Sequence, residues 1–246
     1  ISDNIKDHIL EIRNQQNNIE IVVCAIPFIR DRDIRQSVAG EEHQDRVNAV
    51  REGISKFYQN LSHEIQIYKR KNTPIIATGH LFVNDIELPD YENDLYVGGL
   101  QQISSNKFPK EFDYIALGHI HRNYSINVQG TIRYSGSPLP MSFNEITHKK
   151  AINIVDFKNR IPDIEKIEIP KNRDIIKLKG SFSDIKRNIF NYVNDKPLPP
   201  WFEIEIIESK TNPELKKEAI DYLENIKNIN ILNYKVIFLD NYKNIE

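Results

Sequence analysis

The chain has 246 residues, of which 39% are hydrophobic and 28% charged, enough apolar residues for a buried core in one large domain or a domain and a half. Its formal net charge is only −2, so no overall basic field marks a nucleic-acid-binding protein, and a DNA-binding face must be local. The single cysteine, Cys24, excludes an internal disulfide, and its apolar neighbours predict a buried thiol.

The first half of the chain has the pattern of a strand, a helix and a second strand. Residues 19–28 are apolar and β-branched and predict a buried strand. From 45 to 68, apolar residues recur every three or four positions, which predicts a long amphipathic helix. The next strand is predicted at 75–78, and the polar stretch 81–99 after it has the length of a functional loop.

Histidines follow two apolar runs at the point where each run breaks at a glycine. One run ends in Gly79-His80, and the other ends in Gly118-His119, with His121 two residues further on. Because the carboxyl ends of parallel strands meet at one edge of a sheet, we expect the three histidines on one rim. Neutral imidazole is the commonest nitrogen ligand of transition metals. A two-metal site also needs carboxylates, and the chain offers no obvious set, so the pattern predicts half of such a site.

The second half of the chain predicts two further groups of strands. Strands at 132–134, 151–157 and 164–169 are assigned to the second sheet of a two-sheet sandwich. After Pro170, short strands and helices alternate, which predicts a small α/β domain. Its predicted elements are a strand at 175–178, a helix at 183–193, a strand at 201–207, a helix at 212–226 and a strand at 229–238.

The segments around these motifs resemble part of a known family in order and spacing. They match the later motifs of the calcineurin-like metallophosphoesterases and, within them, of the SbcD family of nuclease subunits of bacterial SbcCD complexes. The earlier family motifs, Asp-x-His, Gly-Asp and Gly-Asn-His, occur nowhere in the chain, so we expect a carboxy-terminal portion of such a protein. The segments are Cys24 to Asp33, Ala77 to Leu81, Asp113 to Arg122 and Arg133 to Pro138.

The resemblance implies an α/β fold. Residues 1–170 would form the second half of a two-sheet α/β/β/α metallophosphoesterase sandwich, and residues 171–246 a small α+β cap domain that positions DNA. It also implies two divalent metal ions, Mn²⁺ with Mg²⁺ as the alternative. In this family pattern His80 and His119 bind one ion and His121 binds the other.

The resemblance further implies a metal-dependent DNA nuclease, acting as an exonuclease and a hairpin endonuclease in DNA repair and recombination. The implied partners are DNA, an SbcC-type ATPase subunit and a second copy of the full-length protein. The catalytic acid histidine of the family would lie upstream, so we expect this chain alone to be inactive. No apolar stretch approaches the roughly 18 residues needed to cross a bilayer, which predicts no membrane association and, with the lone cysteine, a cytoplasmic location.

Several other residues have both a functional and a structural interpretation. Arg30, Arg32 and Arg122 follow predicted strands and are candidates for contacts to the DNA backbone, although a solvated loop is the alternative. Residues 135–138 have turn composition and predict a tight connection, with a supporting role at the site left open. Trp201 is predicted to be a core residue, with base stacking as the alternative. Predicted surface residues are His8, His43, His63, His148 and a loose basic cluster of Lys149, Lys150, Lys171, Arg173, Lys177 and Lys179, for which phosphate contact is also open.

Two other functions remain open at the level of the sequence. A phosphoesterase of another substrate class, such as a nucleotide or protein phosphatase, would keep both histidine motifs but predicts no cap. A non-catalytic DNA-binding scaffold would lack the early motifs altogether.

Overall fold

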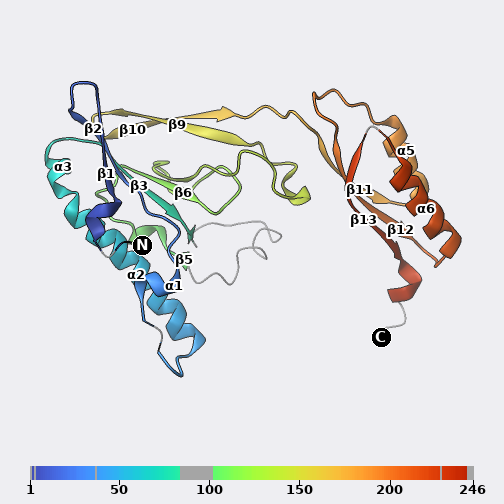
Figure 1. The fold of residues 1–246 in the computed structure, drawn as a ribbon, viewed down its shortest axis with the longest axis horizontal. Coiled ribbons are helices and arrows are strands. Elements are labelled where there is room, and N and C mark those ends of the chain that lie inside the picture. Colours follow the sequence, from blue (N-terminus) through green and yellow to red (C-terminus); the bar gives the residue numbers. More distant parts are fainter. Residues whose placement is uncertain (1, 3, 37, 84–101, 228, 243–246) are drawn as a thin grey trace. The chain divides into compact units, whose positions relative to one another are not determined.

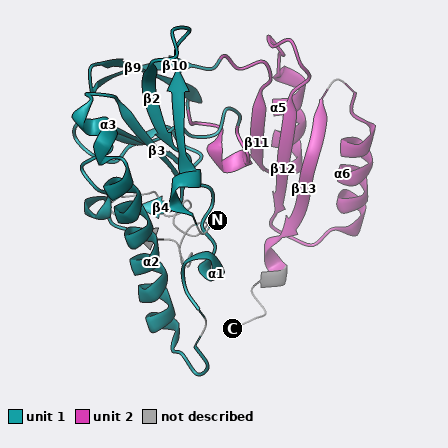
Figure 2. Ribbon diagram, turned by 60° about the vertical axis from the view of Figure 1, so that its left-hand side comes forward, with its two compact units in different colours: residues 1–139, 149–169 teal, residues 140–148, 170–246 magenta. Residues whose placement is uncertain are grey.

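The computed structural model describes most of the chain in two compact units. Unit 1 comprises residues 1–139 and 149–169, and unit 2 comprises residues 140–148 and 170–246 (Figure 2). Each unit has its own hydrophobic core. The described residues are 2, 4–36, 38–83, 102–227 and 229–242. No helix among them is long and apolar enough to cross a membrane.

Unit 1 is built on a six-stranded mixed sheet (Figure 1). Its four inner strands, β2, β3, β6 and β8, run parallel, and the edge strands β1 and β7 run antiparallel to their neighbours. The carboxyl ends of the inner strands therefore share one edge, where polar groups collect in such sheets. In spatial order the strands are β1 (Ile9–Arg13), β2 (Ile19–Cys24), β3 (Ile75–His80), β6 (Tyr114–Gly118), β8 (Ile132–Tyr134) and β7 (Tyr124–Ser125).

Helix α2 (His43–Glu64) packs its apolar stripe on this sheet. Val50, Ile54, Tyr58 and Leu61 are fully buried in the same core as the inner strands. Burial of each such side chain contributes about 1.5–3 kcal/mol. The predicted amphipathic helix is thus confirmed, but α2 itself ends at Glu64, and its C-cap Ile65 (φ −84°, ψ −1°) separates it from the next helical segment.

Shorter helical segments connect the main elements of unit 1. Helix α3 (Gln66–Arg70) continues beyond the break after α2, and helix α1 (Asp31–Ile34) precedes α2. The 3₁₀ turns are η1 (Ile5–His8) and η2 (Ser105–Lys107).

The prediction that residues 132–134 belong to a second sheet is wrong. Strand β8 pairs in parallel with β6 inside the main sheet, because both Ile132 and Tyr134 are buried in its core. The Tyr134 hydroxyl also accepts a hydrogen bond from the Val83 N–H and donates one to the Leu81 carbonyl, each at 2.9 Å. Those bonds fasten β8 to the segment that follows β3.

Strands β9 (Ala151–Lys158) and β10 (Ile161–Glu168) form a separate antiparallel hairpin. Its turn is anchored to the main sheet by Arg160. The guanidinium forms a 2.8 Å ion pair with Asp113 and donates a 2.9 Å hydrogen bond to the Glu111 carbonyl. The Asp113 carboxylate in turn accepts the N–H of Ile75 at the start of β3.

The predicted polar loop 81–99 begins with core residues. Leu81, Phe82 and Val83 are buried, and β4 (Phe82–Val83) pairs in parallel with β5 (Gln102–Ile103). The rest of the predicted loop, 84–99, lies outside the described residues.

Unit 2 confirms the predicted alternation of strands and helices. Three parallel strands lie in the order β11 (Ile175–Gly180), β12 (Trp201–Glu208) and β13 (Asn230–Phe238). Helices α5 (Phe182–Asn191) and α6 (Pro213–Asn225) pack on the face that carries the buried residues of β12. Ser181 and Asn212 cap the two helices by accepting backbone N–H groups. The 3₁₀ turns are η3 (Phe143–Glu145) and η4 (Leu239–Tyr242).

Candidate metal centre

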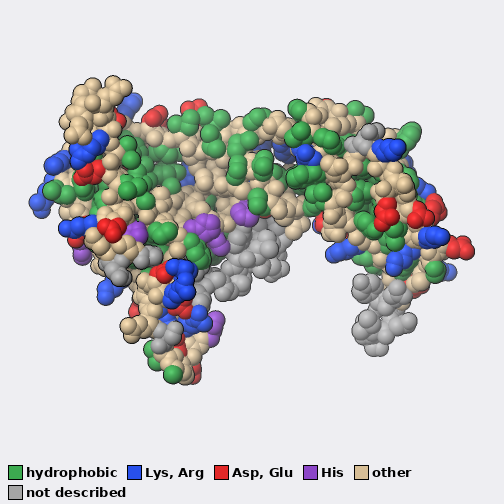
Figure 3. Space-filling view, viewed as in Figure 1, with side chains coloured by type: hydrophobic (Ala, Val, Ile, Leu, Met, Phe, Trp, Pro, Cys, Tyr) green, Lys and Arg blue, Asp and Glu red, His purple; other side chains and the backbone are tan. Residues whose placement is uncertain are grey.

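Two of the three predicted histidines lie together at the carboxyl edge of the main sheet. The register of the parallel strands β3 and β6 places His80 opposite Gly118, so His119 is the next residue beyond the pair. The ring centroids of His80 and His119 are 5.4 Å apart, with their planes inclined at 76°. Figure 3 shows some histidine side chains close together near the centre of the view, with others apart from them. Strand pairing alone therefore brings together residues that are 39 positions apart in the sequence.

Small and aromatic neighbours define the place of the His80 ring. A Cβ atom on Gly118 would lie 2.9 Å from the Nδ1 atom of His80, so the absence of a side chain leaves room for the imidazole. The ring of Phe28 meets the His80 ring edge-on, with 5.8 Å between centroids. Substituting Gly118 would therefore displace His80.

The backbone of His119 is strained. Its φ is +106°, a region that side-chain-bearing residues avoid, and the other described non-glycine residues with positive φ are all asparagines. Such a conformation costs about 1–3 kcal/mol and persists where the surroundings enforce it, often at functional sites.

The imidazole of His119 favours its neutral form. Burial lowers the pKa of His119 first, and the positive charges that His80 and His121 would carry lower this pKa further. A neutral imidazole offers a nitrogen lone pair, which is the form that binds a metal ion.

The described residues contain no group of three or more His, Cys, Asp and Glu side chains arranged to hold a metal ion. Within that part of the chain, the pair of His80 and His119 supplies nitrogen donors, and a bound ion would require further ligands. His121, half-buried just beyond His119, is close enough to affect the pKa of His119.

Curated relatives are similar to the chain over much of its length. The chain is 35% identical over 188 residues to the SbcD subunit of the SbcCD nuclease of Escherichia coli (strain K12), which covers 75% of the chain and 47% of that protein. The chain is a homologue of the SbcD nuclease subunits. The SbcD protein of Staphylococcus epidermidis is 24% identical over 219 residues, which cover 86% of the chain and 56% of that protein. The SbcD protein of Bacillus subtilis is 29% identical over 134 residues, which cover 53% of the chain and 34% of that protein. No family model matches the chain.

The resemblance to SbcD inferred from the motifs is thus confirmed, as is the α/β fold. The chain spans about half the length of the curated relatives it matches.

The arginines predicted to contact DNA in this SbcD homologue differ in their surroundings. Arg30 donates to the carboxylate of Asp33 at 3.0 and 3.1 Å, and this hydrogen bonding lowers the pKa of Asp33 to about 2. Its guanidinium is therefore engaged by the short helix α1 that it precedes. Arg32 and Arg122 are exposed. Contact of these three residues with DNA stays a prediction.

The prediction that the basic cluster lies on the surface is wrong for Lys150. This residue is only 6% exposed, and its ammonium donates to the His121 carbonyl at 2.9 Å. Lys177 and Lys179 are exposed as predicted, and they pair with Glu203 and Glu205 on the neighbouring strand of unit 2. Lys150 is thus a residue near the site that sequence reasoning missed, since nothing in the local pattern distinguishes it from an exposed lysine.

Two other side chains also differ from their predictions. His8 is buried, with its ring packed edge-on against Phe57 at 5.3 Å, so its prediction as a surface residue is wrong. Trp201 is only partly buried, and the guanidinium of Arg173 stacks over its ring at 4.3 Å.

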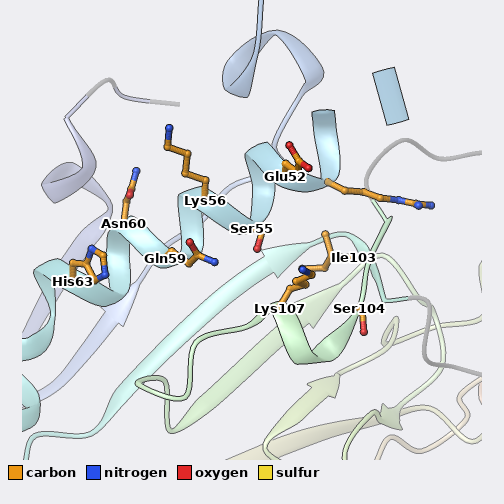
Figure 4. A pocket seen from close by; sticks show the side chains of 10 residues that line it. Glu52, Ser55, Lys56, Gln59, Asn60, His63, Ile103, Ser104 and Lys107 are labelled. Carbon is orange, nitrogen blue, oxygen red and sulfur yellow. The ribbon is translucent and has the colours of Figure 1, made fainter. Parts of the chain in front are cut away.

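A separate cavity of about 630 Å³ lies along helix α2. Ser55 and Gln59 of the helix point toward the segment of Ile103 and Lys107 (Figure 4). Its lining does not include the candidate metal-ligating histidines, so the cavity is distinct from the candidate metal centre.

Proposed function

We propose that the chain forms part of a metal-dependent DNA nuclease subunit of the SbcCD type. The observation that carries this proposal is the pairing of β3 with β6, which brings the rings of His80 and His119 together at the carboxyl edge of the sheet. The homology to SbcD proteins supports the choice of a nuclease over another class of phosphoesterase.

In this proposal His80 and His119 bind one divalent ion and His121 binds a second. The ions are Mn²⁺, with Mg²⁺ as the alternative, since a nitrogen-rich site suits Mn²⁺ better than Mg²⁺, which prefers oxygen ligands. When bound, two such ions neutralise the phosphodiester and activate water for its hydrolysis.

The chain's own residues prepare this site. The lowered pKa of His119 keeps its imidazole neutral, and so available as a ligand, at neutral pH. The missing side chain of Gly118 gives the His80 ring its space. The strained backbone of His119 is consistent with a residue kept for function at some cost in stability.

The assembly follows from the same proposal. Residues 1–170 form a partial phosphoesterase domain, and 171–246 form a cap that helps to position DNA. The partners are DNA, an SbcC-type ATPase and a second copy of the complete gene product, in the cytoplasm. The substrates are DNA ends and hairpins.

The test is cleavage of a labelled hairpin DNA by the complete gene product with its ATPase partner and Mn²⁺. We expect His80→Ala, His119→Ala and His121→Ala each to reduce the cleavage rate by roughly 100-fold or more. Losing a direct metal ligand costs more activity than losing a residue that only orients a ligand. His43→Ala is the matched control, since His43 is an exposed histidine at the start of α2. Equal rates in the control and the three variants would refute the proposal.

A further inference from the structure

The backbone carbonyl of His121 accepts hydrogen bonds from two other segments of unit 1. The N–H of Ser137 donates to it at 3.1 Å, and the Lys150 ammonium donates to it at 2.9 Å. The Ser137 hydroxyl lies 3.4 Å from the same oxygen. A carbonyl with several donors, one of them charged, is held more firmly than one in an ordinary turn.

Lys150 is buried in a way that scattered surface lysines are not. Its residue exposure is 6%, whereas the side chain of its neighbour Lys149 is 74% exposed and pairs with Glu168 at 3.1 Å. Burying an ammonium group is costly unless hydrogen bonds replace its water. Lys150 meets this need with the His121 carbonyl and with the Ser137 hydroxyl, which it reaches at 2.9 Å.

The turn at residues 135–137 closely approaches residues 121–123, which we call the histidine segment. Gly136 has φ +81°, and a Cβ atom there would lie 2.8 Å from the Asn123 nitrogen and 3.0 Å from the His121 oxygen. Only glycine allows this approach without displacing the backbone.

The far end of this segment is held through the side chain of Asn123. The Asn123 amide donates to the Ser135 carbonyl at 3.1 Å and to the Asn153 side chain on β9 at 2.9 Å. The backbone of 121–123 is therefore fixed at both ends.

We propose that Lys150 and Ser137 are positioning residues that fix the backbone of His121 and thereby orient its imidazole. This inference rests on the proposed function, in which His121 is a metal ligand. A ligand must be held within about 0.5 Å of its productive position, and the supporting contacts supply that precision. The Gly-Ser turn and the lysine that precedes β9 thus act on the metal centre through the His121 backbone.

The test compares Lys150→Met with Lys149→Met in the complete gene product. Methionine keeps most of the apolar stem of lysine but removes the charged donor. The first readout is hydrogen exchange of the metal-free protein over residues 119–123 and 135–138, measured by mass spectrometry. The second is Mn²⁺ affinity by calorimetry, and the third is the visible absorption of the Co²⁺-loaded protein, which responds to ligand geometry.

We expect Lys150→Met to speed exchange in both segments, to weaken Mn²⁺ binding by roughly 10-fold, and to shift the Co²⁺ spectrum, while Lys149→Met changes none of these. Ser137→Ala removes one acceptor of Lys150 and should act in the same direction to a smaller extent. If Lys150→Met does not fold, Ser137→Ala decides the outcome.

Two results separate the inference from the proposed function. If His121→Ala weakens Mn²⁺ binding but Lys150→Met and Ser137→Ala behave like Lys149→Met, the positioning role is overturned and the proposed function stands. If His121→Ala leaves Mn²⁺ affinity unchanged, the role of His121 as a ligand fails, and the positioning role fails with it.

Discussion

Gly118 lies directly opposite His80 across the parallel pair β3 and β6, and a Cβ atom on Gly118 would come within 2.9 Å of the His80 Nδ1. We therefore expect Gly118→Ala to push the His80 imidazole out of its place while the sheet still forms. Mn²⁺ affinity of the complete gene product, measured by calorimetry, should fall by roughly 10-fold or more.

The control for this substitution is Gly180→Ala in unit 2. A Cβ atom on Gly180 would meet Asp184 at 3.5 Å, an ordinary contact distance. Circular dichroism should show both variants folded. A Gly118→Ala protein with unchanged Mn²⁺ affinity would argue against His80 as a ligand.

The backbone of His119 allows a second prediction, about stability. Because its φ is +106°, His119→Gly should be more stable than His119→Ala by about 1 kcal/mol, the reverse of the order at positions with negative φ. Urea unfolding of both variants measures the difference. At Ala116, inside strand β6, replacement by glycine should instead lower stability by about 0.5–1 kcal/mol. An alanine variant at 119 as stable as the glycine variant would show that the strain is absent in solution.

The ion pair between Arg160 and Asp113 ties the β9–β10 hairpin to the main sheet. Its side chains are 17% and 10% exposed, so solvent screens it little. Arg160→Ala should lower the free energy of unfolding by about 1.5–3 kcal/mol, since a charged hydrogen-bonding group is lost. A double-mutant cycle with Asp113→Asn isolates the pairwise part. Additive losses would mean that the pair is not formed in solution.

The buried thiol of Cys24 gives a prediction about pH. Burial raises the pKa of Cys24 to about 12. The unfolded chain, with a thiol pKa of about 8.5, loses its proton first, so stability falls as pH rises from about 8.5 toward about 12 and is unaffected below that range. The expected loss is about 1.4 kcal/mol by about pH 9.5.

Denaturant unfolding at a series of pH values measures this loss. Cys24→Ala is the control, because it removes the titrating group and should flatten the dependence between about pH 8 and 9.5. Equal slopes in the two proteins would assign the alkaline effect to other residues.

Much of the secondary structure was predictable from local pattern. The helix at α2, the buried strands β2 and β3, and the alternating elements of unit 2 follow from apolar periodicity, because an amphipathic segment must bury its apolar face. Cys24 is buried as its apolar neighbours predict. The break at Ile65 was not predictable, since the apolar stripe continues through it.

The sequence by itself determined the α/β class, the resemblance to SbcD and the expectation that His80 and His119 share one edge, because strand ends and motif order are local properties of the chain. Only the tertiary structure decided that β8 joins the main sheet, that His8 is buried and that Lys150 holds the His121 carbonyl. Each of these depends on contacts between residues far apart in the chain. Lys149 and Lys150 look alike in the sequence, and the chain leading into β9 turns one toward water and the other toward the histidine segment.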